Sequence, residues 1–546
     1  MSQAIDRGAD TPPLLEETIG SNLEATVSRH GDKEALVVPH QSIRQTWREF
    51  NATVDRVAKG LMAMGIETGD RVGMWSPNYA EWVYIQFATA KIGAVQVNVN
   101  PAYRKSELEY ALNQSGCRLL VTRTEYLTSK YKEMVEAVSA NTPGVEEVIY
   151  FDTPDWDALL DRGSSVSDEA LKERGQSLSN TDPINIQYTS GTTGFPKGAT
   201  LSHRNILNDA LLVAEACMHT ADDRVCIPVP FYHCFGMVMG NLACSAIGST
   251  MVIPSPTFDP EAVLQSVQDE KCTSLYGVPT MFIAELGLHH IGDFDLSSLR
   301  TGIMAGSPCP VEVMRKVIDV MNMSEVTIAY GMTETSPVST QTAATDSVEH
   351  RVTTVGRVLP HAEAKIVDPE TGETLEHGQE GEYCTRGFHV MLGYWDDLEK
   401  TAQAIDEAGW MHSGDLATMD EDGYVNIVGR LKDMIIRGGE NIYPREIEEF
   451  LYTHPDVTDA QVIGVPDERF GEVIMAWIQL ESGATLTEDD IRTFCDGKIA
   501  HFKVPQYIRF VTEFPMTVTG KVRKIEMREQ AIAELGLEAA AQTRTA

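Results

Sequence analysis

The chain has 546 residues, with 42% apolar and 23% charged side chains, as is typical of soluble globular proteins. That length is too great for one compact core and predicts roughly three to four structural units. The net charge of −36, from 44 basic and 80 acidic residues, argues against nucleic acid and anionic membranes as partners, because both require a basic surface.

The cysteine pattern and the N-terminus indicate a reducing, cytoplasmic location. Nine cysteines without a CxxC pair provide neither a disulfide framework nor a zinc-site spacing. Residues 1–10 lack the apolar core of a signal peptide, and the least polar stretch, 236–254, is interrupted by Gly, Asn, Ser and Thr. No integral membrane segment is therefore predicted, while a removed organellar leader stays open.

The first α/β pattern covers residues 71–152. Strand-like runs at 71–75, 94–99, 117–122 and 147–151 alternate with helical patterns such as 79–91. This alternation predicts βαβ units around a parallel sheet.

One helix in this region shows a clear local pattern. Ser106 and Glu109 have the spacing of a capping box, and Gly116 suits the end of the helix. Leu108, Ala111 and Leu112 share one face. The pattern predicts a surface helix with a single buried stripe.

Residues 188–199, YTSGTTGFPKGA, have the composition of a phosphate-binding loop. Gly191, Gly194 and Gly198 allow the backbone to approach a ligand, and hydroxyls and the ammonium of Lys197 can bind phosphate. An apolar run at 184–188 and a helical pattern at 203–218 predict a strand–loop–helix context. Gly198 follows Lys197 where a P-loop requires Ser or Thr, so a GTPase is disfavoured.

Three further regions complete the chain. Strand-like and helical runs alternate again over 249–333 and predict a second α/β sheet. Beyond residue 353, shorter β segments with turn signals such as 368–372 predict an antiparallel hairpin or small barrel. After Gly429, short strands and helices near 444–452 and 488–498 predict a small α+β domain. The tails, 1–12 and beyond 536, are expected to fray.

Six motifs together resemble the adenylate-forming (AMP-binding) enzymes, which include acyl-CoA synthetases, luciferases and peptide-synthetase adenylation domains. They are YTSGTTGFPKG at 188–198, YGMTETSP at 330–337, WMHSGD at 410–415, GRLKD at 429–433, RGGENIYP at 437–444 and TVTGKVR at 517–523. The resemblance covers residues 15–530. The wording of DPINIQYTSGTTG, GATLSHRNI, PFYHCFGM and KDMIIRGGENIYPREIE is most similar to medium-chain fatty acyl-CoA synthetases.

The resemblance implies a nucleotide site. The residues expected to hold the β- and γ-phosphates are Thr189, Ser190, Gly191, Thr192, Thr193 and Lys197. Tyr330 would stack on adenine beside Gly306 and Ser307, and Thr333 would contact the α-phosphate. Glu334 is the expected Mg²⁺ ligand, because ATP arrives with Mg²⁺ and that ion prefers carboxylate and phosphate oxygens. Asp415 would accept hydrogen bonds from the ribose hydroxyls, with Arg430 nearby.

The resemblance also implies two alternating arrangements of one site. Lys521 would stabilise negative charge as the acid attacks the α-phosphorus. Rotation at Lys432 would then withdraw Lys521 and bring the loop with Gly438 and Gly439 to the pantetheine of CoA. His233 would gate the acyl pocket, whose alkyl-binding wall is expected near residues 237–246, although an apolar core would have the same composition.

We therefore predict an α/β fold with a large N-terminal domain (1–431) of two parallel-type sheets plus a small β-barrel. A small mobile α+β C-terminal domain (432–546) follows. The predicted function is an ATP-dependent fatty acid:CoA ligase using ATP, Mg²⁺ and CoA, with medium-chain acids favoured. The alternatives are a long-chain or aryl acid:CoA ligase, a fatty acyl-AMP ligase, an amino-acid adenylation domain and a catalytically silent AMP-binding sensor. The oligomeric state stays open, with a homodimer as one option.

Overall fold

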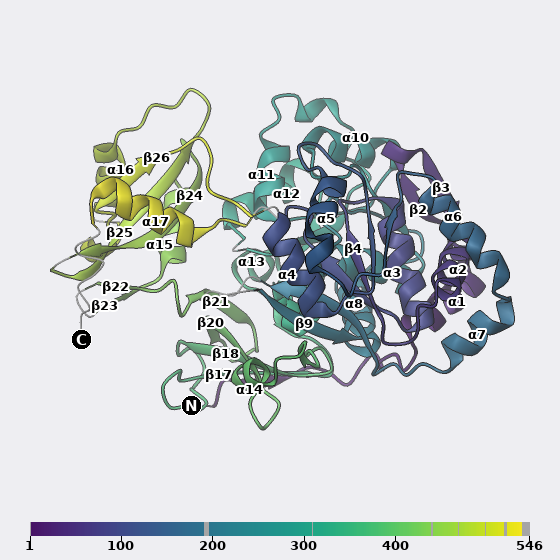
Figure 1. The fold of residues 1–546 in the computed structure, drawn as a ribbon. Coiled ribbons are helices and arrows are strands. Elements are labelled where there is room, and N and C mark those ends of the chain that lie inside the picture. Colours follow the sequence, from purple (N-terminus) through teal and green to yellow (C-terminus); the bar gives the residue numbers. More distant parts are fainter. Residues whose placement is uncertain are drawn as a thin grey trace.

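The computed structural model describes residues 2–189, 196–307, 309–437, 440–467, 469–496, 498–517 and 521–537. Two large sheets, a smaller antiparallel sheet and a separate C-terminal body make up the fold (Figure 1). The mixed α/β class and the small C-terminal α+β unit agree with the prediction.

The seven-stranded sheet has the order β19-β9-β8-β5-β4-β6-β7. Its strands are β4 (Arg71–Trp75), β5 (Val95–Val99), β6 (Leu119–Thr122), β7 (Glu147–Tyr150), β8 (Pro183–Thr189), β9 (Lys197–Ser202) and β19 (Gly393–Tyr394). The strands from β8 to β7 run parallel, which confirms the βαβ prediction, whereas β9 is antiparallel to β8.

The nine-stranded sheet has the order β16-β15-β14-β13-β12-β10-β11-β2-β3. Its strands are β2 (Glu34–Val38), β3 (Ile43–Thr46), β10 (Arg224–Cys226), β11 (Thr250–Val252), β12 (Ser274–Gly277), β13 (Thr301–Ala305), β14 (Glu325–Gly331), β15 (Val338–Gln341) and β16 (Arg357–Val358). Its centre, from β2 to β14, is parallel, and this confirms the second predicted α/β sheet.

Fourteen helices accompany these sheets within the described residues. They are α1 (Ile19–His30), α2 (Trp47–Ala63), α3 (Ala80–Ile92), α4 (Lys105–Ser115), α5 (Tyr131–Val138), α6 (Asp155–Arg162), α7 (Asp168–Gln176), α8 (His203–Ala216), α9 (Ala243–Ile247), α10 (Pro260–Glu270), α11 (Pro279–Leu286), α12 (Val311–Val320), α13 (Val348–Thr353) and α14 (Leu398–Ala404). Every residue of α3 except Glu81 is buried, as expected for a helix that is apolar on all sides.

The antiparallel sheet has the order β1-β17-β18-β20-β21. Its strands are β1 (Ile5–Arg7), β17 (Ala362–Val367), β18 (Gly381–Gly387), β20 (Met411–Met419) and β21 (Val425–Arg430). Antiparallel pairing was predicted, but this strand order has two edges, β1 and β21, rather than the closure of a barrel. The N-terminal tail was predicted to fray and instead forms β1, because β17 supplies backbone partners and Ala4 becomes fully buried.

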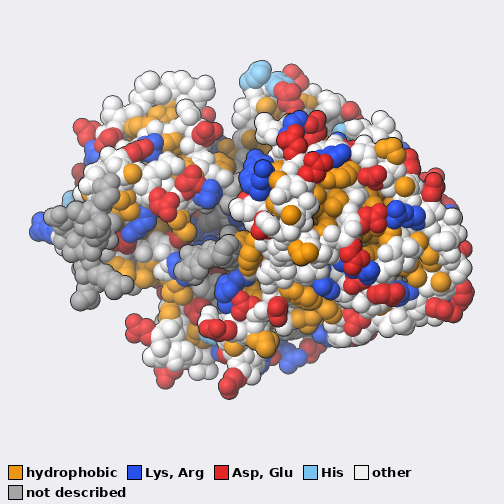
Figure 2. All heavy atoms as spheres, in the orientation of Figure 1, with side chains coloured by type: hydrophobic (Ala, Val, Ile, Leu, Met, Phe, Trp, Pro, Cys, Tyr) orange, Lys and Arg blue, Asp and Glu red, His pale blue; other side chains and the backbone are white. Residues whose placement is uncertain are grey.

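The C-terminal body follows β21 and has its own apolar core. It contains β22 (Ile435–Arg437), β23 (Glu440–Ile442), β24 (Val457–Asp467), β25 (Gly471–Leu480), β26 (Tyr507–Phe510), α15 (Pro444–Tyr452), α16 (Glu488–Cys495) and α17 (Lys524–Leu535). Figure 2 shows the molecular surface hollowed between this body and the larger one.

One helix begins at a different residue from the one that the sequence predicted. Helix α4 buries Leu108, Ala111 and Leu112 as predicted, but its N-cap is Arg104 rather than Ser106, and Glu107 rather than Glu109 folds back on the N-cap backbone. The helix begins earlier because the Glu107 carboxylate accepts a hydrogen bond from the Arg104 backbone N–H at 2.9 Å.

Other expectations concern burial. All nine cysteines are buried and free, as predicted. Within the described residues, no helix combines the length and apolarity needed to cross a lipid bilayer.

Candidate active site

The carboxyl ends of β13 and β14 define the centre of the site. These strands pair in parallel, with Ala305 beside Ala329, so Gly306 and Tyr330 emerge at the same sheet edge. In α/β sheets this edge is where ligands bind. Gly306 has a φ of +92°, a conformation that glycine adopts without the steric cost of a side chain.

Tyr330 and Asp415 meet beside that edge. The Tyr330 hydroxyl donates a hydrogen bond of 2.8 Å to Asp415 Oδ2. Asp415 on β20 is paired in register with Arg430 on β21, and Arg430 Nε lies 3.2 Å from Asp415 Oδ1. Burial raises the pKa of Asp415, while the Arg430 charge acts in the opposite direction. The three predicted residues therefore form one cluster.

A second cluster surrounds Glu334. This residue is only 6% exposed and lies in the short 3₁₀ turn Thr333–Thr335 after β14. Glu334 Oε1 accepts hydrogen bonds from the hydroxyls of Tyr394 at 2.8 Å and Thr189 at 3.3 Å. Lys197 Nζ lies 4.8 Å from the centre of the Tyr394 ring. The residues predicted to hold phosphate and Mg²⁺ thus converge from different sheets.

Tyr394 was not predicted as a site residue. It lies on β19, which pairs with β9, so the pairing brings its ring beside Lys197. Neither the spacing nor the composition of residues 393–395 signals this neighbourhood. Burial raises the pKa of Tyr394, and the Glu334 charge adds to that shift, so its hydroxyl remains a donor.

The predicted strand–loop–helix context of the phosphate-binding loop is wrong. The described residues on either side of it, Thr189 and Lys197, belong to the antiparallel neighbours β8 and β9, and α8 begins only after β9. A hairpin therefore presents Lys197, and a helix N-terminus does not contribute directly. The predicted residues Ser190, Gly191, Thr192 and Thr193 lie outside the described residues, as do Gly438 and Gly439.

Lys521 extends from the C-terminal body to this site. Its Cε atom lies 3.7 Å from the position that a Cβ atom would take at Gly306. Although Lys521 is exposed as a whole residue, the protein around its ammonium group lowers its pKa, and the nearby Arg430 charge adds to the lowering. Asp415 and Glu334 oppose that shift. The ammonium group therefore acts within the same electrostatic environment as both carboxylates.

His233 is close enough to Lys521 to be affected by its charge. Burial, with a smaller contribution from the charge of Lys521, lowers the pKa of His233 to about 3, so its imidazole is neutral at pH 7. The residue precedes a π-helix, Phe235–Leu242, whose seven residues from Gly236 to Leu242 are all buried. π-helical turns are rare and frequently occur at functional sites. Sequence periodicity did not predict this one.

Besides Lys521, helix α15 also contacts the large body. The guanidinium of Arg445 donates a hydrogen bond to the Ile427 carbonyl on β21, and Glu449 accepts one from the Val311 N–H at 3.4 Å. Lys432, the predicted hinge residue, is exposed between β21 and β22. The polar character of these contacts is typical of an interface that can separate.

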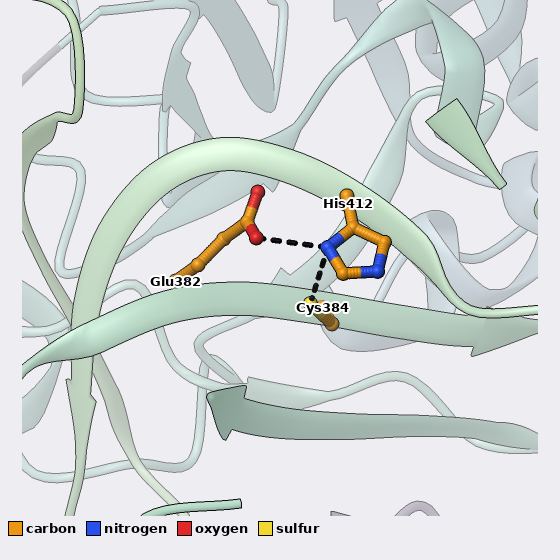
Figure 3. A group of neighbouring side chains, drawn as sticks. All are labelled: Glu382, Cys384 and His412. Atoms are coloured by element: carbon orange, nitrogen blue, oxygen red, sulfur yellow. Dashed lines mark hydrogen bonds and ion pairs between the residues drawn. The ribbon is translucent and has the colours of Figure 1, made fainter. Parts of the chain in front are cut away.

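One group within the described chain has the spacing of a metal site: Glu382, Cys384 and His412 (Figure 3). His412 Nδ1 lies 2.8 Å from Glu382 Oε2 and 3.4 Å from Cys384 Sγ. Hydrogen bonding to Glu382 raises the pKa of His412, and burial raises the pKa of the Cys384 thiol. To bind a metal, the His412 imidazole and the Cys384 thiol would have to lose the protons that these raised pKa values favour. The three side chains therefore fit a hydrogen-bonded cluster better than a metal site.

Hydroxyls, carboxylates and ammonium groups thus surround one sheet edge, an arrangement that suits a nucleotide polyphosphate. The chain belongs to the AMP-binding enzyme family: the family model matches residues 23–395. The model of the AMP-binding enzyme C-terminal domain matches residues 446–521. These matches confirm the predicted adenylate-forming family.

Curated relatives extend over nearly the whole chain. It is 50% identical to YngI of Bacillus subtilis (strain 168), provisionally named an acyl-CoA synthetase, over 96% of this chain and 99% of the relative. It is 46% identical to the mitochondrial medium-chain acyl-CoA ligase ACSF2 of Danio rerio, over 97% of this chain and 91% of the relative. The predicted enzyme class, an AMP-forming acyl-CoA ligase, agrees with these relatives.

A solved structure of similar architecture is the anthranilate CoA ligase AuaEII in complex with anthranoyl-AMP. It superposes with a TM-score of 0.85 at 27% identity, over 96% of this chain and 99% of that one. The similarity includes both bodies of the fold.

Proposed function

We propose that this protein is an ATP-dependent fatty acid:CoA ligase that acts on medium-chain acids. The acid carboxylate attacks the α-phosphorus of ATP, forming acyl-AMP and releasing pyrophosphate. The CoA thiolate then attacks the acyl carbon, forming the thioester and releasing AMP. The observation that carries this proposal is the position of Lys521 beside Gly306 and within the electrostatic environment of Asp415 and Glu334.

In the first half-reaction, Tyr330 and Asp415 would hold the nucleoside, and Thr189 and Lys197 the leaving phosphates. The hydrogen bond between Tyr330 and Asp415 supports a shared ligand, since it fixes the ring and the carboxylate relative to each other. Lys521 would stabilise charge at the α-phosphate, with Thr333 and Arg430 nearby. A positioned cation is effective there because the transition state spreads negative charge over the phosphoryl oxygens.

The surroundings of Glu334 fit a magnesium site. Its side chain accepts hydrogen bonds from two hydroxyl groups, those of Tyr394 and Thr189, and a buried carboxylate beside hydroxyl oxygens suits a hard cation. Bound Mg²⁺ would neutralise charge on the phosphates. Glu334 would hold it, and Tyr394 would orient the carboxylate.

For the second half-reaction, the C-terminal body (432–546) would rotate about Lys432. Lys521 would leave, and the loop containing Gly438 and Gly439 would approach the pantetheine. The polar contacts of Arg445 and Glu449 support a separable interface, because water can replace hydrogen bonds of this kind when the bodies move apart. His233, which is neutral and adjacent to Lys521, would change position as the lysine withdraws.

The choice of medium-chain acids rests on the amino-acid sequences of the motifs and on the similarity to ACSF2, which is named a medium-chain acyl-CoA ligase. This choice of substrate is tested by measuring pyrophosphate release, with and without CoA. The acids compared are saturated acids from acetate to stearate, and aryl acids. We expect a maximum at medium chain length and thioester formation with CoA. No release with any acid would overturn the ligase proposal. Release without a thioester would identify a fatty acyl-AMP ligase, and an aryl or long-chain maximum would reassign the substrate.

A further inference from the structure

A bulge in β20 places Asp415 at the nucleotide site. On the neighbouring strand β18, Glu382 is paired with Leu416 and Cys384 with His412. Tyr383 alone therefore faces three residues of β20, Ser413 to Asp415. Bulges redirect side chains and are frequent beside active sites. Here the bulge ends at the carboxylate that meets Tyr330.

One carboxylate oxygen of Glu382 contacts this bulge and the other contacts His412, the residue just before it. Oε1 accepts a hydrogen bond from the Gly414 N–H at 3.0 Å, and Oε2 pairs with His412 Nδ1 at 2.8 Å. Gly414, with a φ of +72°, is the turning point of the bulge. The Glu382 side chain is only 12% exposed, so these contacts lie where water competes little.

Three further contacts support the bulge and its surroundings. The Ser413 hydroxyl donates to the Tyr383 carbonyl at 2.6 Å and accepts from the Asp415 N–H at 3.1 Å. The Tyr383 ring packs edge-on against Tyr330, with centroids 5.3 Å apart. Residues 382 and 383 of β18 therefore support both Asp415 and Tyr330, although neither residue reaches the nucleotide site.

We propose that Glu382 is a positioning residue for nucleotide binding: by holding Gly414 and His412, it presents the Asp415 carboxylate to the ribose hydroxyls. This inference rests on the proposed function, because it assumes that Asp415 meets the ribose. It implies that loss of Glu382 weakens recognition of the sugar in particular, and leaves the acid and CoA sites intact.

The test compares binding of AMP and 2′-deoxy-AMP to the full chain by titration calorimetry, which requires neither acid nor CoA. In Glu382→Gln the negative charge is lost and only one acceptor oxygen remains, which can accept from the Gly414 N–H. The amide N–H₂ can face His412 only if Nδ1 carries no proton, so the charge-assisted contact between residue 382 and His412 is lost in either case. We expect AMP affinity to fall by about tenfold or more, as for a lost hydrogen bond to a charged group. The preference for AMP over 2′-deoxy-AMP should shrink, while KM for the fatty acid stays unchanged.

The matched control is Glu363→Gln on the adjacent strand β17. Glu363 pairs with Arg386 in the same sheet, with Arg386 Nε at 2.9 Å, and it does not contact the bulge. This variant loses the same charge and an ion pair, but we expect unchanged nucleotide preference.

Variants of His412 keep the proposal testable if Glu382→Gln folds poorly. In His412→Asn the side-chain N–H₂ can replace the Nδ1–H donor, and we expect sugar preference to be retained. His412→Leu should reduce it. An unchanged preference in both Glu382→Gln and His412→Leu would overturn the inference while leaving the ligase proposal intact. If the wild-type protein bound neither AMP nor 2′-deoxy-AMP, both this inference and the ligase proposal would be overturned.

Discussion

The Cε atom of Lys521 lies 3.7 Å from the position that a Cβ atom would take at Gly306. One residue ends a central strand of the large body, and the other lies in the hairpin that precedes α17 of the small one. In that hairpin the Thr517 N–H donates to the Lys521 carbonyl at 2.7 Å, which fixes the base of the lysine. A Cβ atom at Gly306 would therefore be in van der Waals contact with the lysine side chain.

We predict that Gly306→Ala strongly reduces pyrophosphate release. A Cβ atom there would lie 3.2 Å from Val278 Cγ1 and in contact with Lys521, and the φ of +92° would be strained. The control is Gly372→Ala, where φ is +71° but no atom lies within 4 Å of the new Cβ. It should lose about 1 kcal/mol of stability and keep adenylation. Equal rates of pyrophosphate release by Gly306→Ala and Gly372→Ala would contradict a role for the approach of Lys521 to Gly306.

Lys521→Ala should separate the two half-reactions. We expect loss of acyl-AMP formation from acid and ATP, because the ammonium group proposed to stabilise charge at the α-phosphate is removed. Thioester formation from supplied acyl-AMP should remain near the wild-type rate. Lys498→Ala, which removes an exposed lysine from the same body, should affect neither. Equal loss of both half-reactions in Lys521→Ala would refute the two-arrangement mechanism.

Tyr394→Phe tests the support of the proposed magnesium ligand. The variant removes the hydroxyl that donates to Glu334 at 2.8 Å. Because groups that orient metal ligands commonly contribute about 10- to 100-fold in affinity, half-saturating Mg²⁺ for pyrophosphate release should rise by about that factor. Tyr424→Phe removes a similar bond, to Asp346 at 2.9 Å, away from the site. A magnesium requirement that rises equally in both variants would argue against a specific role.

His203 should make the protein less stable in acid. It is fully buried, and burial lowers its pKa from 6.5 to about 3. Between those values the unfolded chain binds a proton that the folded protein does not, so stability falls as the pH falls. One such group contributes at most about 1.4 kcal/mol per pH unit.

The variant His203→Asn can still accept the Ile19 N–H that His203 Nδ1 accepts at 3.2 Å, but it does not titrate. Denaturant unfolding of both proteins between pH 7 and pH 4 should show a shallower loss of stability for the variant. Parallel curves would show that His203 does not contribute to the acid sensitivity.

The sequence predicted much of the fold because local patterns agree with tertiary packing. The alternation over 71–152 became four parallel strands, and α15 has the predicted bounds 444–452. Prediction from the sequence failed where pairing with a segment far away in the chain determined the local structure. Residues 5–7 form a strand only because β17 lies alongside. The phosphate-binding loop joins two antiparallel strands because β9 also pairs with β19, nearly two hundred residues later in the chain.

The sequence by itself determined the family, the enzyme class and most residues of the candidate site, since Tyr330, Glu334, Asp415 and Lys521 all occur within short motifs. Only the tertiary structure showed that Lys521 reaches Gly306, that Tyr394 contacts Glu334 and that Glu382 supports the bulge before Asp415. The physical reason is that motif residues reflect local chemistry, whereas these contacts depend on strand register and on how the two bodies meet.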